Sequence, residues 1–148
     1  MSRITRNQIM DALLAQFEDN MTTVKFFERK FQEFSQTPMS GDMPILMLCK
    51  PKENYPPRAI KSEPPKRTFT VEAIIYISAG QDQNATPDET VCDIMDDVDL
   101  ALRPVGVNKT QTLGGLVSHC YIEGDVICVP GDLDGLGMIH IPLTIVLP

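Results

Sequence analysis

The apolar run from Met138 to Leu147 constrains the fold most strongly, because its side chains alternate with a period of two. One face would carry Ile139, Ile141, Leu143, Ile145 and Leu147, and the other Met138, His140, Pro142, Thr144 and Val146. This alternation is typical of a β-strand with one buried face. Pro142 has no N–H to donate to a ladder, so we expect the strand to lie at a sheet edge or to be bulged there.

The segment before this run predicts a hairpin partner. Leu116 to Val129 has the composition of a strand, with Gly124 as a bulge or bend. Between the two strands lies a glycine-rich stretch in which Asp132 and Asp134 favour turns. Position twelve counted from Asp132 is leucine, where a calcium loop needs glutamate, so an acid-rich turn is favoured over a calcium site.

Two helices are expected upstream of the hairpin. Thr5 and Gln8 form a capping box that predicts a helix from Arg6 to Glu18. Thr86 is placed to cap a second helix, which Pro104 would end. Three further strands are predicted at Thr23–Phe31, Pro44–Lys50 and Arg67–Ser78. The first of these also fits a helical spacing, but its β-branched and aromatic content favours a strand.

The element order is therefore α-β-β-β-α-β-β. It predicts an α+β fold, with a mostly antiparallel sheet and the two helices packed on one face. A length of 148 residues favours a single domain spanning 1–148. The segment Pro51–Arg67 holds five prolines, which we interpret as excluding a ladder or a helix there. Residues 51–66 would then form a basic, proline-rich arm.

Charge is segregated along the chain. The formal net charge of −7 argues against non-specific binding to nucleic acid or to an anionic membrane. No apolar run approaches the ~20 residues that a membrane helix needs. Lys50–Arg67 has six basic and two acidic residues, a net of 6 − 2 = +4, whereas Asp82–Asp99 has seven acidic residues and no basic one.

The four cysteines form no C-x-x-C pair. Cys49, Cys92, Cys120 and Cys128 are expected to be small buried hydrophobic residues of a protein in a reducing cytosol. A zinc site would need closer pairing of its ligands.

The sequence contains no complete catalytic or ligand-binding motif. His119 and His140 lie on the two C-terminal strands and would come close if those strands paired. With Asp132 and Asp134 they are the basis of one alternative, a small metal-dependent hydrolase. The chain lacks a third ligand signature, a nucleotide-binding glycine pattern and a G-x-S-x-G elbow, so we predict no catalytic residue, metal or cofactor.

Three stretches resemble the tail terminator proteins of long-tailed bacteriophages, a minor-tail or tail-completion family typified by the lambda U protein. They are TRNQIMDALLAQF at 5–17, PPKRTFTVEAIIYISAG at 64–80 and QTLGGLVSHCYIEGDVICVPGDLDGLGMIHIPLTIVLP at 111–148. The resemblance implies a structural, non-enzymatic virion protein that forms a homo-hexameric ring on the head-proximal end of the tail tube. Such a ring stops tube polymerisation and forms the tail side of the head–tail joint.

The expected partners are further copies of the chain, the tail tube protein and a neck or head-completion protein. The protein would reside in the virion, and in the host cytoplasm during assembly. The main alternative is a head-completion or connector protein of the neck, which is also small and ring-forming. DNA must pass through the ring during ejection, so we expect a neutral to acidic lumen.

A ring needs two different patches repeated head to tail. The charge blocks suggest that the basic arm docks on the acidic surface of a neighbour, although both blocks are equally consistent with solvated faces. The predicted interface residues are Lys52, Arg58, Lys61, Lys66, Asp93, Asp96, Asp97, Asp132 and Asp134.

Overall fold

The computed structural model describes residues 4–29, 44–55, 67–78, 88–129 and 136–147. The helices are α1 (Arg6–Asn20) and α2 (Asp88–Ala101). The strands are β1 (Phe26–Glu28), β2 (Ile45–Asn54), β3 (Thr68–Ser78), β4 (His119–Ile122), β5 (Ile127–Val129) and β6 (Leu136–Val146). None of the helices in these ranges is long and apolar enough to cross a membrane.

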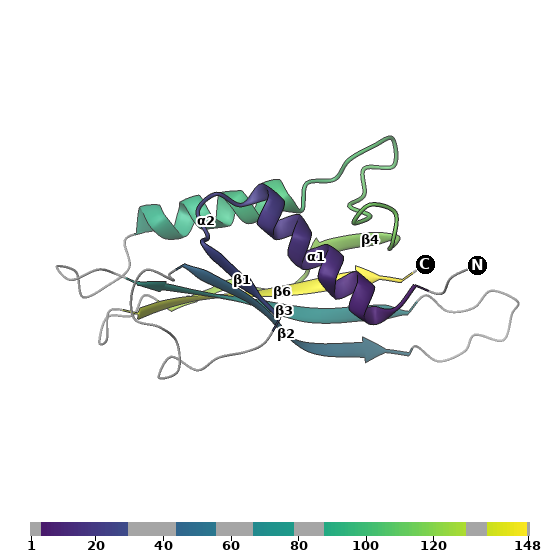
Figure 1. Ribbon diagram of the computed structural model, residues 1–148, viewed down its shortest axis with the longest axis horizontal. Helices are drawn as coiled ribbons and strands as arrows, with labels where there is room; N and C mark the ends of the chain where they lie inside the picture. Colours follow the sequence, from purple (N-terminus) through teal and green to yellow (C-terminus); the bar gives the residue numbers. More distant parts are fainter. Residues whose placement is uncertain (1–3, 30–43, 56–66, 79–87, 130–135, 148) are drawn as a thin grey trace, which may run out of the picture.

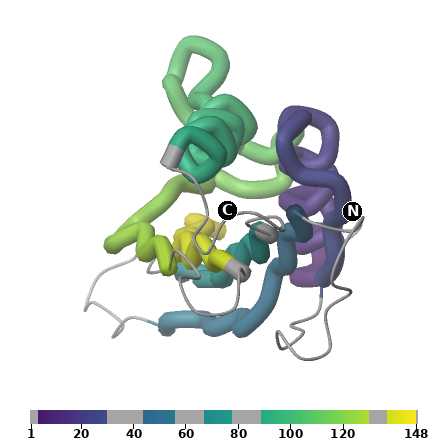
Figure 2. Tube along the Cα trace, turned by 90° about the vertical axis from the view of Figure 1, so that its left-hand side faces the viewer, coloured from purple at the N-terminus to yellow at the C-terminus, as the bar shows by residue number. Residues whose placement is uncertain are grey.

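The strands form one sheet in the order β1-β2-β3-β6-β4, and β5 also pairs with β6. The pair β1–β2 is parallel and every other pair is antiparallel. Both helices lie on one face of this sheet (Figure 1), and Figure 2 shows the same two layers from the side. The predicted α+β fold, with a mostly antiparallel sheet and helices on one face, is confirmed.

The main core lies between the helices and the sheet. The odd-numbered residues of β6 are buried as the alternation predicts, and they pack with the corresponding face of β3. The helices contribute Ile9, Leu13, Phe17, Ile94 and Val98. Burying an aliphatic side chain of this size stabilises the fold by ~1.5–3 kcal/mol, so this layer supplies most of the driving force.

Helix α1 begins as predicted. The Gln8 backbone N–H donates to Thr5 Oγ1 at 3.2 Å, and the Thr5 N–H donates to Gln8 Oε1 at 2.7 Å. These reciprocal bonds satisfy two backbone donors that a helix start leaves free. The helix continues two residues past the predicted Glu18, and Met21 closes it with an N–H bond to the Phe17 carbonyl.

Strand β6 is central, so the expectation of an edge position for it is wrong. Pro142 lies opposite Glu72 of β3 without a register shift. Its carbonyl accepts from the Glu123 N–H at 3.2 Å, on the other side of the strand. In a strand, N–H and C=O of one residue point the same way, so the missing N–H faces the gap between β4 and β5. The predicted second strand is split at this gap, where Gly124 has φ 111°.

Strand β2 extends to Asn54, so the expectation that Pro51 excludes a ladder is wrong. The pairing with β3 shifts by one residue between Cys49 and Lys52, and Lys50 has φ 54°. Pro51 therefore lies in a β-bulge, where a missing N–H is tolerated. The extra residue reverses the side-chain alternation, so Lys52 lies on the face away from the helices and Glu53 on the helix side.

The remaining predictions have mixed outcomes. The first strand exists but is short, and α2 ends at Ala101, three residues before Pro104. Cys49 and Cys120 are buried as expected, whereas Cys92 and Cys128 are exposed, so the prediction is wrong for those two. The cap at Thr86 and the turn at 130–135 lie outside the described residues.

Candidate functional site

The sheet face that carries no helix has an apolar end and a polar end. At the apolar end Ile45, Met47, Ile74 and Tyr76 are buried in a second, smaller core cluster. At the polar end two adjoining cavities of about 470 and 640 Å³ form what we term the open-face groove. Both cavities are lined by Lys52, Thr70, Glu123 and Thr144.

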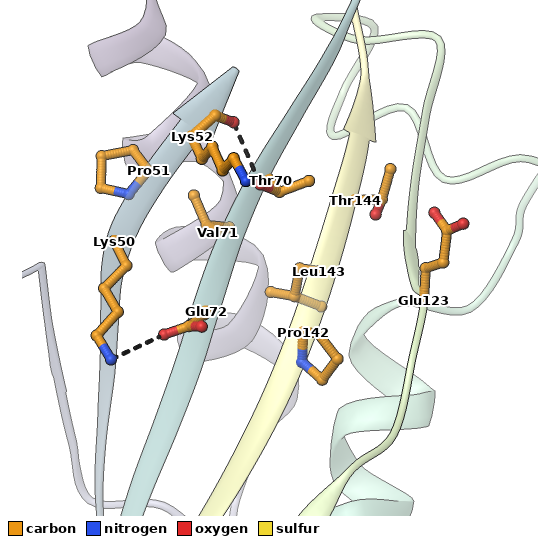
Figure 3. A pocket seen from close by; sticks show the side chains of 10 residues that line it. All are labelled: Lys50, Pro51, Lys52, Thr70, Val71, Glu72, Glu123, Pro142, Leu143 and Thr144. Carbon is orange, nitrogen blue, oxygen red and sulfur yellow. Dashed lines mark hydrogen bonds and ion pairs between the residues drawn. The ribbon is translucent and has the colours of Figure 1, made fainter. Parts of the chain in front are cut away.

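The β-bulge of β2 forms one wall of the open-face groove. Lys50, Pro51 and Lys52 all line it, and Figure 3 shows their side chains beside the floor residues of β3. The Thr70 hydroxyl donates to the Lys52 carbonyl at 3.2 Å, which ties this wall to the floor. In a regular strand continuing from Cys49, Lys50 and Lys52 would both point to the helix side, so the bulge is what turns this wall toward the groove.

Glu72 lies at the boundary between the apolar end and the groove. Its Oε1 is 3.2 Å from His140 Nε2, and its Oε2 is 3.3 Å from Lys50 Nζ. The Glu72 side chain is 30% exposed, so water screens these pairs only in part. The carboxylate thus links β2, β3 and β6 across the face.

The segment after β4 forms the opposite wall. Glu123 stands across the groove from Lys50 and Lys52 (Figure 3). Burial of the phenol and then the nearby Glu123 carboxylate raise the pKa of Tyr121, which lines the larger cavity. One wall of the groove is therefore cationic and the other anionic.

Glu53 also lines the larger cavity, and it is the centre of a cluster with Arg6, Tyr55 and Arg67. Glu53 Oε2 accepts from Arg6 Nη2 at 2.6 Å and from the Tyr55 hydroxyl at 2.8 Å, and Arg67 Nη1 lies 3.8 Å from Glu53 Oε1. The hydrogen bonds from Arg6 and Tyr55 lower the pKa of Glu53, and the bond to Glu53 raises that of Arg6. This cluster fastens the start of α1 to the ends of β2 and β3.

The groove presents polar, charged and apolar groups. Within the described ranges no three His, Cys, Asp or Glu side chains are grouped to hold a metal ion. Burial raises the pKa of Cys120 to about 12, which leaves that thiol protonated and unreactive at neutral pH. What the groove offers is hydroxyls, two charged walls and the apolar rings of Pro51 and Pro142.

The structure separates the two histidines. His119 of β4 lies opposite Val146 of β6. His140 lies on β6 itself, opposite Ile127 and six residues before Val146. At ~3.4 Å per residue this separation is ~20 Å along the strand, so they form no common site. His119 Nδ1 instead accepts the Gln111 N–H at 3.1 Å, and its ring stacks on Tyr121.

The predicted interface residues fall into three groups. Lys52 lines the open-face groove, and Asp93 and Asp96 are exposed on α2. Asp97 Oδ2 accepts the N–H groups of Thr22 and Thr23 at 3.1 and 3.0 Å and the Thr23 hydroxyl at 2.7 Å, so it ties α2 to the segment after α1. Arg58, Lys61, Lys66, Asp132 and Asp134 lie outside the described residues.

Sequence reasoning missed the residues that shape the groove. No sequence signal joins Glu72 to Lys50 or His140. Glu53 was counted within a charged arm, although the structure places it in a cluster with Arg6. The sequence signal that could have located the groove is the presence of Pro51 and Pro142 inside strand-like runs, because prolines there mark bulges and gaps in the pairing.

No protein-family model matches this sequence, and a search of curated proteins finds no significant relative.

Proposed function

We propose that this chain is a structural subunit of a ring that caps the tail tube of a long-tailed bacteriophage. The observation that carries the proposal is that the three stretches resembling tail terminators form one packed body. They supply α1, β3 and β4 to β6, and β3 pairs with β6 over its whole length, from Thr68 to Ser78. A resemblance confined to surface loops would carry much less weight.

The arrangement of surfaces supports a ring. The helices cover one sheet face, whereas the other face presents the open-face groove. The chain therefore offers chemically different patches on opposite sides, which head-to-tail contact between identical subunits requires. In this proposal the subunit acts by shape and contact, without catalysis, and its net charge of −7 suits a lumen that must release DNA.

The proposal is tested by adding the purified protein to a tail tube protein of the same phage while that protein polymerises into tubes. We expect tubes to stop growing, with a ring at one end in electron micrographs. The matched control omits the chain and should give tubes of unlimited length. Rings that bind isolated capsid necks and leave tube growth unchanged would instead indicate the connector alternative, and the cap proposal would be wrong.

A further inference from the structure

A short loop after α2 projects from the molecule and carries an unusual amount of apolar surface. We term residues 105–110, VGVNKT, the tip loop; it stands out beyond the helix layer in Figures 1 and 2. Val107 is 98% exposed and Val105 is 51% exposed. A single exposed valine is common, but here both lie on one projecting turn.

The tip loop is held in shape by its own hydrogen bonds. The Val105 N–H donates to the Thr110 carbonyl at 3.1 Å, and the Lys109 N–H to the Gly106 carbonyl at 3.4 Å. Lys109 adopts φ 51°, in the left-handed region, which residues other than glycine and asparagine rarely adopt. Such a conformation persists where the surroundings enforce it.

The base of the tip loop is also fixed. Gln111 is buried, with 4% exposure, and its side-chain amide is satisfied at both ends. Nε2 donates to the Arg103 carbonyl at 2.8 Å, and Oε1 accepts the Leu113 N–H at 3.1 Å. A loop anchored in this way loses little conformational entropy when it binds, so its apolar tip is preorganised for a partner.

We propose that the tip loop of one subunit inserts into the open-face groove of a second copy of this chain. Val107 packs against the rings of Pro51 and Pro142, and Lys109 meets the anionic wall at Glu123. Each valine is thereby removed from water, and the only charge of the loop gains an opposite charge. This inference rests on the proposed ring and identifies the contact that joins its subunits.

The placement of the two surfaces allows repeated contact between copies of the chain. The tip loop projects on the helix side, whereas the groove opens on the opposite face of the sheet (Figures 1 and 3). The contact is therefore heterologous, and each copy can donate one loop and receive another. Repetition of such a contact closes a ring when the rotation between neighbours allows it.

Cross-linking between mixed variants tests the contact directly. Cys92 and Cys128 are exposed, so both are first changed to serine. In this background V107C is mixed with T70C, at the groove floor, under a mild thiol oxidant at ring-forming concentration. We expect a disulfide-linked dimer in the mixture and none from either variant alone. E18C on the exposed side of α1 replaces T70C as the control and should give no dimer.

Charge reversal provides the second test. K109E should weaken ring association about tenfold in sedimentation or native mass spectrometry, and combining it with E123K should restore most of the loss. K109N retains a residue suited to the left-handed turn and isolates the effect of charge. Val107→Asp should disrupt rings while the melting temperature stays unchanged, because this side chain makes almost no contact within the subunit.

The outcomes separate this inference from the proposed function. Rings that cap tubes normally despite Val107→Asp, without V107C–T70C dimers, would overturn the tip-loop contact and leave the cap proposal standing. If the tip variants still form rings but no longer bind the tube, the loop contacts the tube protein and this inference is wrong. If the unmodified protein fails to cap tubes yet gives the dimer, the contact holds and the proposed function fails.

Discussion

Gly124 lies so close to Pro142 that a Cβ atom on the glycine would stand 3.2 Å from Cγ of the proline ring. The contact occurs where β4 and β5 separate, opposite the one residue of β6 that lacks an N–H on that side. Three sequence features, a glycine, a proline and a broken strand, are thus one structural feature. The segment between β4 and β5 leaves the sheet at Pro142, where β6 has no N–H to donate to it.

We expect Gly124→Ala to destabilise the fold by about 1–3 kcal/mol, because φ is 111° and the methyl group meets Pro142. Urea unfolding measures the change. Gly115→Ala is the matched control, with φ 94° and no neighbouring atom within 4 Å, and should cost less. Pro142→Ala in the Gly124→Ala background should recover part of the difference if the ring contact contributes.

The Glu53 cluster predicts a pH-dependent stability. Because the folded-state pKa of Glu53 is lowered, its contribution is present above the unfolded value near 4.5 and is lost as the pH falls through the folded value. Denaturant melts of Glu53→Gln should therefore show a shallower loss of stability below about pH 4.5 than the unmodified protein. Asp11→Asn, which removes a carboxylate from a more exposed ion pair with Arg29, is the matched control.

Asp97→Ala should destabilise the protein by about 1–3 kcal/mol, because it leaves the N–H groups of Thr22 and Thr23 without their acceptor. Asp96→Ala, one residue away and exposed, should change stability by less than about 0.5 kcal/mol. Thermal unfolding of the two variants makes the comparison. Equal effects would show that the contact is unimportant.

Thiol labelling should divide the cysteines into two pairs. At pH 8 in the native protein, a disulfide reagent should modify Cys92 and Cys128, while Cys49 and Cys120 react only after unfolding. Burial raises the pKa of both protected thiols, to about 12 for Cys120, which slows attack further. Four rapidly reacting thiols in the native state would contradict this burial.

The docking of the basic arm on an acidic neighbour stays a prediction. Reversing Arg58 and Lys61 to glutamate should weaken ring assembly at low salt, where charge pairing is least screened. Converting Asp93 and Asp96 to lysine in the same chain should restore part of it; Asp96 is chosen because Asp97 is engaged within the subunit. Unchanged assembly at low salt in the first variant would leave both charge blocks as solvated faces.

Local signals predicted the elements and their buried faces well. The alternation of β6 and the Thr5–Gln8 capping box depend on neighbouring residues alone, and both are confirmed. The fold class followed from the order of these elements. What the sequence did not predict depends on partners distant along the chain, which no local pattern encodes.

The position of β6 and the length of β2 illustrate this limit. A proline is excluded from a ladder only where its N–H is needed, and that need depends on the neighbouring strand. Pro142 faces a gap, and Pro51 lies in a bulge, so both are accommodated. The roles of Glu53 and Asp97 were missed for the same reason, since their partners lie 47 and 74 or 75 residues away.

The central position of β6 has a consequence for biosynthesis. This strand follows all other described elements along the chain, yet it joins β3 to β4 and β5. While a nascent chain is being made, β1 to β3 can pair with one another, but β4 and β5 still lack the strand with which they pair, and β3 has an unpaired apolar edge. Folding must wait for a pairing that closes a loop of about 60 to 80 residues, a slow, non-local step. Completion of the sheet must therefore wait until β6, the last of the described elements, has emerged from the ribosome.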